Sequence, residues 1–151
     1  MKIFFCIFIF TLSINTSACE CVARSLQEYY LSADEIYVGQ VISKKEICES
    51  SASKFCGGPN AYSIKPKEYL KFRSYTEPSN KDGEFNLTYI FESGSDCDAG
   101  FEVGKTYLVY AKSASFGVYG TNLCSGTIEI SKAQKSIIQL HKIKENFEPL
   151  K

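Results

Sequence analysis

The sequence has no tryptophan, one histidine and one methionine among its 151 residues. It also has no net charge, because 17 Lys and Arg residues balance 17 Asp and Glu residues. Without a basic excess to neutralise phosphates, nucleic acid is not expected as a partner. In place of tryptophan there are ten Tyr and eleven Phe, and this aromatic content favours strands. A hydrophobic content of 44% is enough to build the core of one domain.

The motifs that mark common catalytic sites are also missing. The chain contains no Gly-x-Ser-x-Gly, His-Glu-x-x-His, P-loop or Gly-x-Gly-x-x-Gly pattern. His141, the single histidine, falls in a predicted C-terminal helix, where we interpret it as a solvated residue near the helix end. Asp96 and Asp98 flank Cys97 in a polar stretch and are interpreted as turn formers. We therefore expect neither an enzyme nor a bound cofactor.

No hydrophobic run is long enough to cross a bilayer, which takes about 20 residues. The longest run, residues 3–12, follows Met1-Lys2 and precedes a small and polar stretch that ends at Ala18. This pattern is typical of a signal peptide at residues 1–18, with cleavage after Ala18 and a mature chain that begins at Cys19. The protein is expected to be secreted, into the periplasm if the source is bacterial, and to have no membrane span.

The cysteines become even in number once Cys6 is removed with the signal peptide. Six remain, and an even count in an exported domain predicts three disulfides among fifteen possible connectivities. Local spacing suggests one pair, Cys48–Cys56, on the two sides of a polar loop. The other four would then pair with each other across the chain. A zinc site is the alternative, but Cys-x-Cys matches the usual zinc spacing poorly. The six are Cys19, Cys21, Cys48, Cys56, Cys97 and Cys124.

Hydrophobic patterns predict two helices and about five strands. Ser25 and Glu28 form a capping-box pattern at the start of a helix over residues 25–32. A second helix, residues 131–144, carries one apolar stripe. Phe85, Leu87, Tyr89 and Phe91 alternate strictly, which predicts a strand with one buried, apolar face. The strands are expected at residues 35–47, 62–75 (with an irregular start at Pro66), 85–91, 106–111 and 116–119.

This order predicts a mainly β domain, residues 19–151, in which a five-stranded OB-fold barrel is flanked by helices. The sequence Cys19-Glu20-Cys21-Val22-Ala23, placed directly after the expected cleavage point, resembles the start of the tissue inhibitors of metalloproteinases and of related netrin-like domains. Residues 33–41 (ADEIYVGQV), 101–111 (FEVGKTYLVYA) and 122–125 (NLCS) extend this similarity through most of the mature chain.

The resemblance implies a disulfide-stapled barrel with bridges Cys19–Cys97 and Cys21–Cys124, whereas Cys48–Cys56 has no obvious counterpart in the vertebrate inhibitors. It also implies that Cys19 binds the catalytic zinc of a target metalloprotease and that Glu20 enters the specificity pocket beside it. The expected partner is a zinc metalloprotease, bound by a monomer. The implied inhibitory edge consists of Cys19, Glu20, Cys21, Val22, Ala23, Ser95, Asp96 and Cys97.

Glu20 departs from the family pattern, because inhibitors of matrix-type proteases usually carry Ser or Thr there. A carboxylate in an apolar pocket would be desolvated and would approach the catalytic glutamate of the protease. We therefore expect weak inhibition of matrix-type proteases, or a target whose pocket is basic or open.

Two other hypotheses remain open. The domain could be a secreted netrin-like binding or structural module that inhibits no protease, because a fold does not fix a function. It could also be a lipoprotein, since Thr16-Ser17-Ala18-Cys19 resembles a lipobox. Lipid attachment to Cys19 would leave five cysteines, so the even count argues against it.

Overall fold

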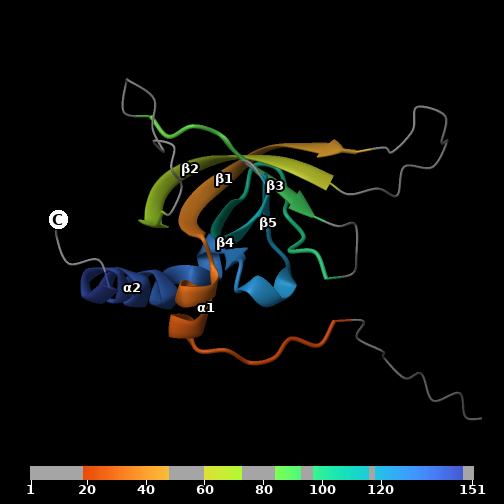
Figure 1. Ribbon diagram of the computed structural model, residues 1–151. Coiled ribbons are helices and arrows are strands. Elements are labelled where there is room, and N and C mark those ends of the chain that lie inside the picture. Colours follow the sequence, from red (N-terminus) through yellow and green to blue (C-terminus); the bar gives the residue numbers. More distant parts are fainter. Residues whose placement is uncertain (1–18, 48–59, 73–83, 93–96, 116–117, 148–151) are drawn as a thin grey trace, which may run out of the picture.

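The computed structural model describes residues 19–47, 60–72, 84–92, 97–115 and 118–147, which are mainly β-structure (Figure 1). The expected signal peptide at residues 1–18 and the expected Cys48–Cys56 bridge lie outside these residues. The elements in chain order are α1 (Leu26–Ser32), β1 (Glu35–Glu46), β2 (Asn60–Lys71), β3 (Thr88–Glu92), β4 (Thr106–Ser115), β5 (Val118–Gly120), the 3₁₀ helix η1 (Leu123–Ser125), β6 (Ile128–Glu129) and α2 (Ile130–Phe147).

Five of the strands close into a barrel. β1 pairs antiparallel with both β2 and β4, β2 pairs with β3, and β5 lies parallel to β3 and antiparallel to β4. The short β6 adds to the same edge of β4 as β5 does. The predicted fold class, a disulfide-stapled OB-like barrel with flanking helices, is confirmed.

Residues 35–39 of β1 and residues 107–111 of β4 are buried on both faces, which explains their largely apolar sequences. Alternate residues of a strand point to opposite sides, and here both sides are covered. Tyr37 and Val109 belong to the cluster inside the barrel, together with residues of β2 and β3. Ile36 and Leu108 belong to a second cluster, which packs against α1 and α2 at one end of the barrel (Figure 1). The two strands thus form the wall between two hydrophobic cores.

The side chain of Ile64 in β2 packs against Gly39 of β1. A Cβ atom placed there would lie 2.6 Å from Ile64 Cγ2, so no larger residue fits without a shift of the neighbouring side chain. Gly39 is opposite Pro66, and the register slips between Val38 and Gly39. Pro66 therefore marks an irregularity inside β2 rather than at its start, because a bulge tolerates the missing N–H of proline.

The expectation for the apolar face at residues 85–91 is wrong. Thr88 and Glu92 of β3 are buried, whereas Leu87 and Tyr89 are exposed. Both buried polar side chains have partners, because Thr88 Oγ1 lies 3.2 Å from the hydroxyl of Tyr69 and Glu92 accepts a hydrogen bond from a backbone N–H. A satisfied polar group can occupy a barrel interior, and here two such groups share the inner face with an isoleucine.

Both predicted helices are present. The capping box of α1 is complete, with Ser25 and Glu28 exchanging hydrogen bonds. The stripe of α2 faces the second core, where Ala133 and Leu140 are buried. His141 lies more than one turn before the end of α2 and pairs with Glu68 of β2, 3.2 Å away, so its contact is with the barrel rather than with the helix terminus.

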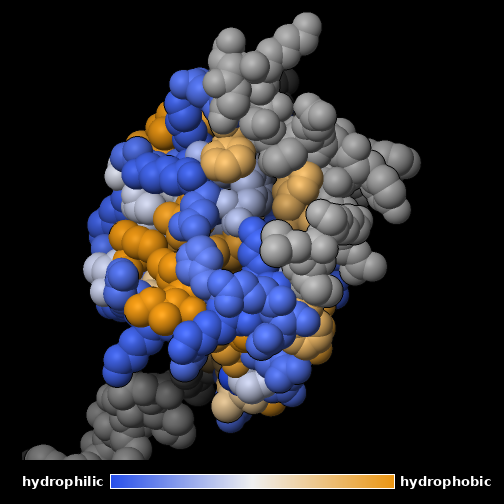
Figure 2. Space-filling model, turned by 90° about the vertical axis from the view of Figure 1, so that its left-hand side faces the viewer, coloured by the Kyte–Doolittle hydropathy of each residue, from blue (hydrophilic) through white to orange (hydrophobic). Residues whose placement is uncertain are grey.

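The end of the molecule that carries the helices exposes some hydrophobic surface. Figure 2 views the side on which α2 ends, where hydrophilic side chains surround a smaller hydrophobic patch. Leu31 of α1 and Ile138 and Phe147 of α2 are among the exposed large hydrophobic residues. Neither of the described helices combines the length and the apolar character needed to span a membrane.

Candidate functional site

The chain enters the structure as an N-terminal segment, residues 19–24, that has no regular secondary structure and runs along the surface to α1 (Figure 1). Cys19 is half-buried, whereas Glu20, Cys21 and Ala23 are exposed and Val22 is 77% exposed. A partner protein could therefore reach four of the six described residues that the resemblance assigns to the inhibitory edge.

Two disulfides hold this segment against the barrel. Cys19 is bonded to Cys97, with 5.6 Å between the Cα atoms, and Cys21 is bonded to Cys124, with 5.1 Å between them. These are the pairings that the resemblance implies. They join residues 78 and 103 positions apart, and closing loops of this length stabilises a fold by typically about 2–4 kcal/mol for each bridge. Because the bridges flank Glu20 on both sides, its backbone has little freedom to move.

The segments that receive the two bridges are connected to each other. The backbone N–H of Leu123 donates to the carbonyl oxygen of Cys97 over 2.7 Å. The side chain of Asn122 caps η1 by accepting from the N–H of Cys124 over 2.9 Å. Gly126 ends η1 in the left-handed region, at φ 91°, where glycine is favoured. Cys97 and Cys124 therefore belong to one hydrogen-bonded platform beneath the N-terminal segment.

Glu92 ties the Cys97 side of this platform to the barrel. Its side chain is 2% exposed and accepts a hydrogen bond from the backbone N–H of Gly100 over 3.2 Å. Burial raises the pKa of Glu92, the negative charge of Asp98 raises it further, and the hydrogen bonds to the loop backbone oppose both effects. A buried carboxylate thus fixes the loop that carries the first bridge.

The other end of the N-terminal segment is fixed by α1. Ser25 caps the helix, and its own N–H donates to Glu28 over 2.7 Å. At the opposite end of α1, the Lys71 ammonium group donates to the carbonyl oxygens of Tyr30 and Ala33. A lysine is favourable there because helix C-termini carry partial negative charge. The segment is held at Cys19, at Cys21 and at the start of α1.

Several predicted site residues are brought together, and two are not described. The structure gathers Cys19, Cys21 and Cys97 at one surface, and Glu20 lies between the two bridged positions. Ser95 and Asp96 lie outside the described residues. Sequence reasoning did not single out Leu123, which is 50% exposed beside Cys124. The only sequence feature that could have indicated a role for Leu123 was its position before Cys124 in Asn-Leu-Cys.

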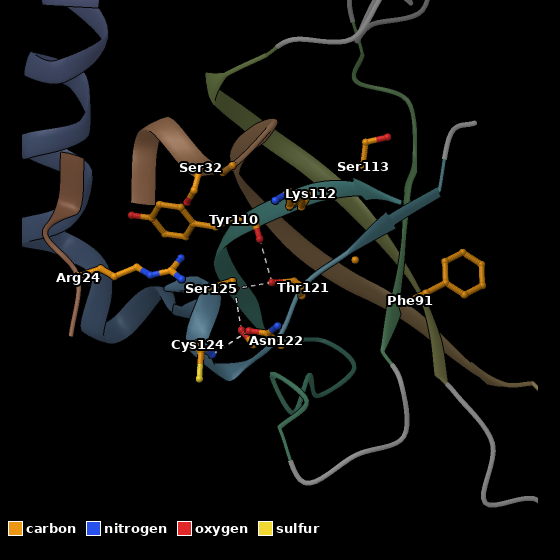
Figure 3. Close-up of a pocket in the computed structure, with 13 residues that line it drawn as sticks. Arg24, Ser32, Phe91, Tyr110, Lys112, Ser113, Thr121, Asn122, Cys124 and Ser125 are labelled. Atoms are coloured by element: carbon orange, nitrogen blue, oxygen red, sulfur yellow. Dashed lines mark hydrogen bonds between the residues drawn. The ribbon is translucent and has the colours of Figure 1, made fainter. Parts of the chain in front are cut away.

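A cleft of about 460 Å³ lies next to this surface (Figure 3). It was not predicted from the sequence, because it is built from side chains of α1, three strands and η1 that meet only in the folded barrel. Its lining residues are Arg24, Ser32, Ala33, Phe91, Tyr110, Ala111, Lys112, Ser113, Gly120, Thr121, Asn122, Cys124 and Ser125.

Within the described part of the chain, no group of three or more His, Cys, Asp and Glu side chains is placed to hold a metal ion. The four described cysteines form disulfides, so the alternative of a zinc site built from these four thiols is wrong. Comparison of the sequence with protein-family models gave no match, and comparison with curated proteins gave no significant match.

Proposed function

We propose that the protein is a secreted inhibitor of zinc metalloendopeptidases that acts through its mature N-terminus at Cys19. The observation that carries this proposal is the pair of bridges at Cys19 and Cys21, which fixes an exposed segment to the barrel at both sides of Glu20. Export with cleavage after Ala18 would make the α-amino group of Cys19 the first group of the chain.

The chemistry of an N-terminal residue suits an open catalytic zinc. An α-amino group has a pKa of about 7.7–8.0, so a neutral nitrogen lone pair is accessible near physiological pH. This nitrogen and the carbonyl oxygen of Cys19 can together form a five-membered chelate ring. Catalytic zinc sites keep a coordination position for water or substrate, and the chelate would replace that water.

Rigid attachment makes this chelate more favourable. A loose terminus would lose conformational freedom on binding, which costs about 0.5–1.5 kcal/mol for each immobilised side chain and more for the backbone. The bridges at Cys19 and Cys21 remove most of that freedom before the target arrives. The hydrogen bond between Leu123 and Cys97 stabilises the platform under both bridges.

In this proposal Glu20 would select the target. Its side chain is exposed between the two bridged residues, so it would enter the pocket next to the zinc. A carboxylate is unfavourable in an apolar pocket, and it is repelled by the catalytic glutamate of the protease. The proposed targets are therefore metalloendopeptidases with a basic or open pocket.

The test compares two forms of the exported protein against a panel of zinc metalloendopeptidases. One form begins at Cys19, and the other carries one added alanine before Cys19. The added residue turns the amine into an amide, which does not bind zinc, so we expect inhibition to disappear. A form with one alanine added after Lys151 is the control and should inhibit fully. Equal inhibition by all three forms would contradict the proposal and would favour a binding module that uses another surface.

A further inference from the structure

The cleft beside the N-terminal segment has a size typical of small-molecule sites, which range over about 300–1,000 Å³. It lies between Arg24 on one side, the end of α1, the end of β4 and the turn that leads into η1 (Figure 3). Cys124 also lines it, so the cleft adjoins the Cys21–Cys124 bridge. Its position is separate from Cys19, and its chemistry can be considered independently of protease inhibition.

The floor of the cleft is a cluster of hydroxyl groups whose hydrogen bonds are satisfied within the protein. Thr121 Oγ1 donates to the carbonyl oxygen of Tyr110 over 2.9 Å, and Ser125 Oγ donates to the carbonyl oxygen of Asn122 over 2.6 Å. Thr127, which does not itself line the cleft, supports this floor: its Oγ1 accepts from the N–H of Tyr110 over 3.0 Å and lies 2.7 Å from Thr121 Oγ1. Because Thr121 and Thr127 are each only 9% exposed, this floor is rigid and is shaped before any ligand binds.

The walls add hydrogen-bond donors to this floor. Arg24 and Lys112 each contribute a cation, and both side chains are exposed enough to reach a ligand. Asn122 uses its side-chain oxygen to accept from Cys124 N–H, which leaves its amide NH₂ group as the part that can donate. In Figure 3, Arg24 extends toward Ser125, Lys112 lies on the opposite side of Tyr110, and Asn122 lies beside Thr121.

No carboxylate is among the residues that line the cleft, all of which lie within the described part of the chain. Two carboxylates lie at the rim of the cleft: Asp34 accepts from the N–H of Ser113, a lining residue, over 2.9 Å, and Glu28, held by Ser25 in the capping box, is close enough to Arg24 for the guanidinium to help lower the pKa of Glu28. The lining itself therefore presents a planar guanidinium, an ammonium and an amide, with both carboxylates held at the rim by other hydrogen bonds. A guanidinium matches the geometry of carboxylates and phosphates in particular.

From this arrangement we infer that the cleft is a binding site for a small oxyanion, the carboxylate or phosphate group of a small molecule. Arg24 and Lys112 hold its charge, and Asn122 donates to one of its oxygens. This goes beyond protease inhibition, because it assigns a ligand to a surface that does not include Cys19.

The experiment is a titration of the isotope-labelled exported protein, followed by the backbone amide signals of residues 111–113 and 120–125. Inorganic phosphate and sodium acetate are the two probes, and sodium chloride at equal ionic strength is the control. We expect saturable shifts with at least one probe, and the tighter of the two identifies the class of oxyanion. Shifts that grow linearly, or that chloride reproduces, would overturn the inference.

Charge-removing variants test the assignment of residues. Arg24→Gln and Lys112→Gln should each weaken binding by roughly tenfold, because each removes one charge-assisted hydrogen bond. Lys132→Gln, on an exposed position of α2 outside the cleft, is the matched control and should bind as the parent does. Both cleft residues are exposed, so the fold should persist, and an unchanged thermal midpoint checks this. Unaltered affinity in both cleft variants would overturn the site.

Discussion

The buried carboxylate of Glu35 makes the stability of the barrel depend on pH. Glu35 is 2% exposed and accepts a hydrogen bond from the hydroxyl of Tyr119 over 2.6 Å. Burial raises the pKa of Glu35, the hydrogen bond to Tyr119 lowers it, and the neighbouring charge of Asp34 raises it. The net direction is upward, so the folded protein holds the proton of Glu35 more tightly than the unfolded chain does.

The upward shift in the pKa of Glu35 determines how the stability of the fold changes with pH. The contribution of Glu35 to the free energy of unfolding is fully present below its unfolded pKa of about 4.3. It is lost as the pH rises through the higher pKa of the folded state. We predict that Glu35→Gln gains stability relative to the parent as the pH rises from about 4 to about 7, because glutamine cannot ionise. Urea unfolding at both pH values measures the difference.

Glu28 provides a control of opposite sign. The hydrogen bonds from Ser25 lower the pKa of Glu28 in the folded protein. The contribution of Glu28 to the free energy of unfolding is therefore present above its unfolded pKa and is lost as the pH falls through its folded pKa. Glu28→Gln should therefore lose stability relative to the parent over the same rise in pH. Curves for Glu35→Gln that run parallel to those of the parent at all pH values would show that Glu35 ionises as freely in the barrel as in water.

A second prediction concerns Glu20 and the target. If Glu20 enters the pocket beside a protease zinc, then Glu20→Thr removes a desolvated charge and its repulsion from the catalytic glutamate. We expect inhibition of matrix-type proteases to tighten by at least about tenfold, which corresponds to about 1.4 kcal/mol. Inhibition constants for parent and variant give the answer. Glu46→Thr removes an exposed carboxylate far along β1 and should change nothing. Unchanged or weaker inhibition by Glu20→Thr would place Glu20 outside the pocket.

At the scale of elements, the short helix η1 determines where the second bridge is anchored. It ends at Gly126, at φ 91°, and a Cβ atom there would lie 3.1 Å from the ring of Tyr29 in α1. Gly104 has a similar conformation, at φ 89°, but a Cβ atom there would meet nothing within 4 Å. Substitutions at these two glycines can therefore distinguish the free-energy cost of a left-handed backbone from the cost of steric crowding.

We predict that Gly104→Ala destabilises the fold by about 1 kcal/mol through its backbone conformation alone, and that Gly126→Ala costs more because α1 must also shift. Thermal or urea unfolding of both variants measures the difference. The extra loss in Gly126→Ala should be accompanied by faster hydrogen exchange in residues 19–24, whose anchor is Cys124. Equal losses in the two variants would mean that Tyr29 does not constrain η1.

Secondary structure could be predicted from sequence patterns better than the orientation of side chains could. The capping box at Ser25 and the stripe of α2 are local signals, and both predicted helices are present. In β3 the period of two was visible, but the apolar face of the pattern points outward. The partners that allow Thr88 and Glu92 to be buried, Tyr69 and Gly100, come from other parts of the chain, and a local pattern does not contain them.

In the candidate site, too, a local motif could be read from the sequence, whereas contacts between distant residues could not. The Cys-x-Cys motif marked the N-terminal segment, and the resemblance supplied the pairings of Cys19 and Cys21 that the structure contains. Spacing alone left those pairings open among the remaining cysteines. The cleft could not be predicted from the sequence. Arg24 and Lys112 both line it, but they lie far apart along the chain, and only the folded barrel brings them to one cleft.

At the scale of the whole molecule, one barrel holds an exposed N-terminal segment through two covalent links and a hydrogen-bonded platform. The interior core and the core under the helices share β1 and β4 as a common wall. Thr121 and Thr127, on either side of η1, hydrogen-bond to the backbone of Tyr110, so the platform is attached to β4. Such a scaffold can hold a short segment in one conformation for recognition, which is the physical basis of the proposed inhibition.

The central claim is that the mature chain begins at Cys19 and that this residue is bridged. The most direct measurement is the intact mass of the exported protein, before and after reduction and alkylation, together with N-terminal sequencing. The account predicts a single chain that starts at Cys19, carries no lipid, and has every cysteine in a disulfide until it is reduced. A chain that starts at another residue, a mass increased by acyl groups, or a reduced thiol at Cys19 would contradict it.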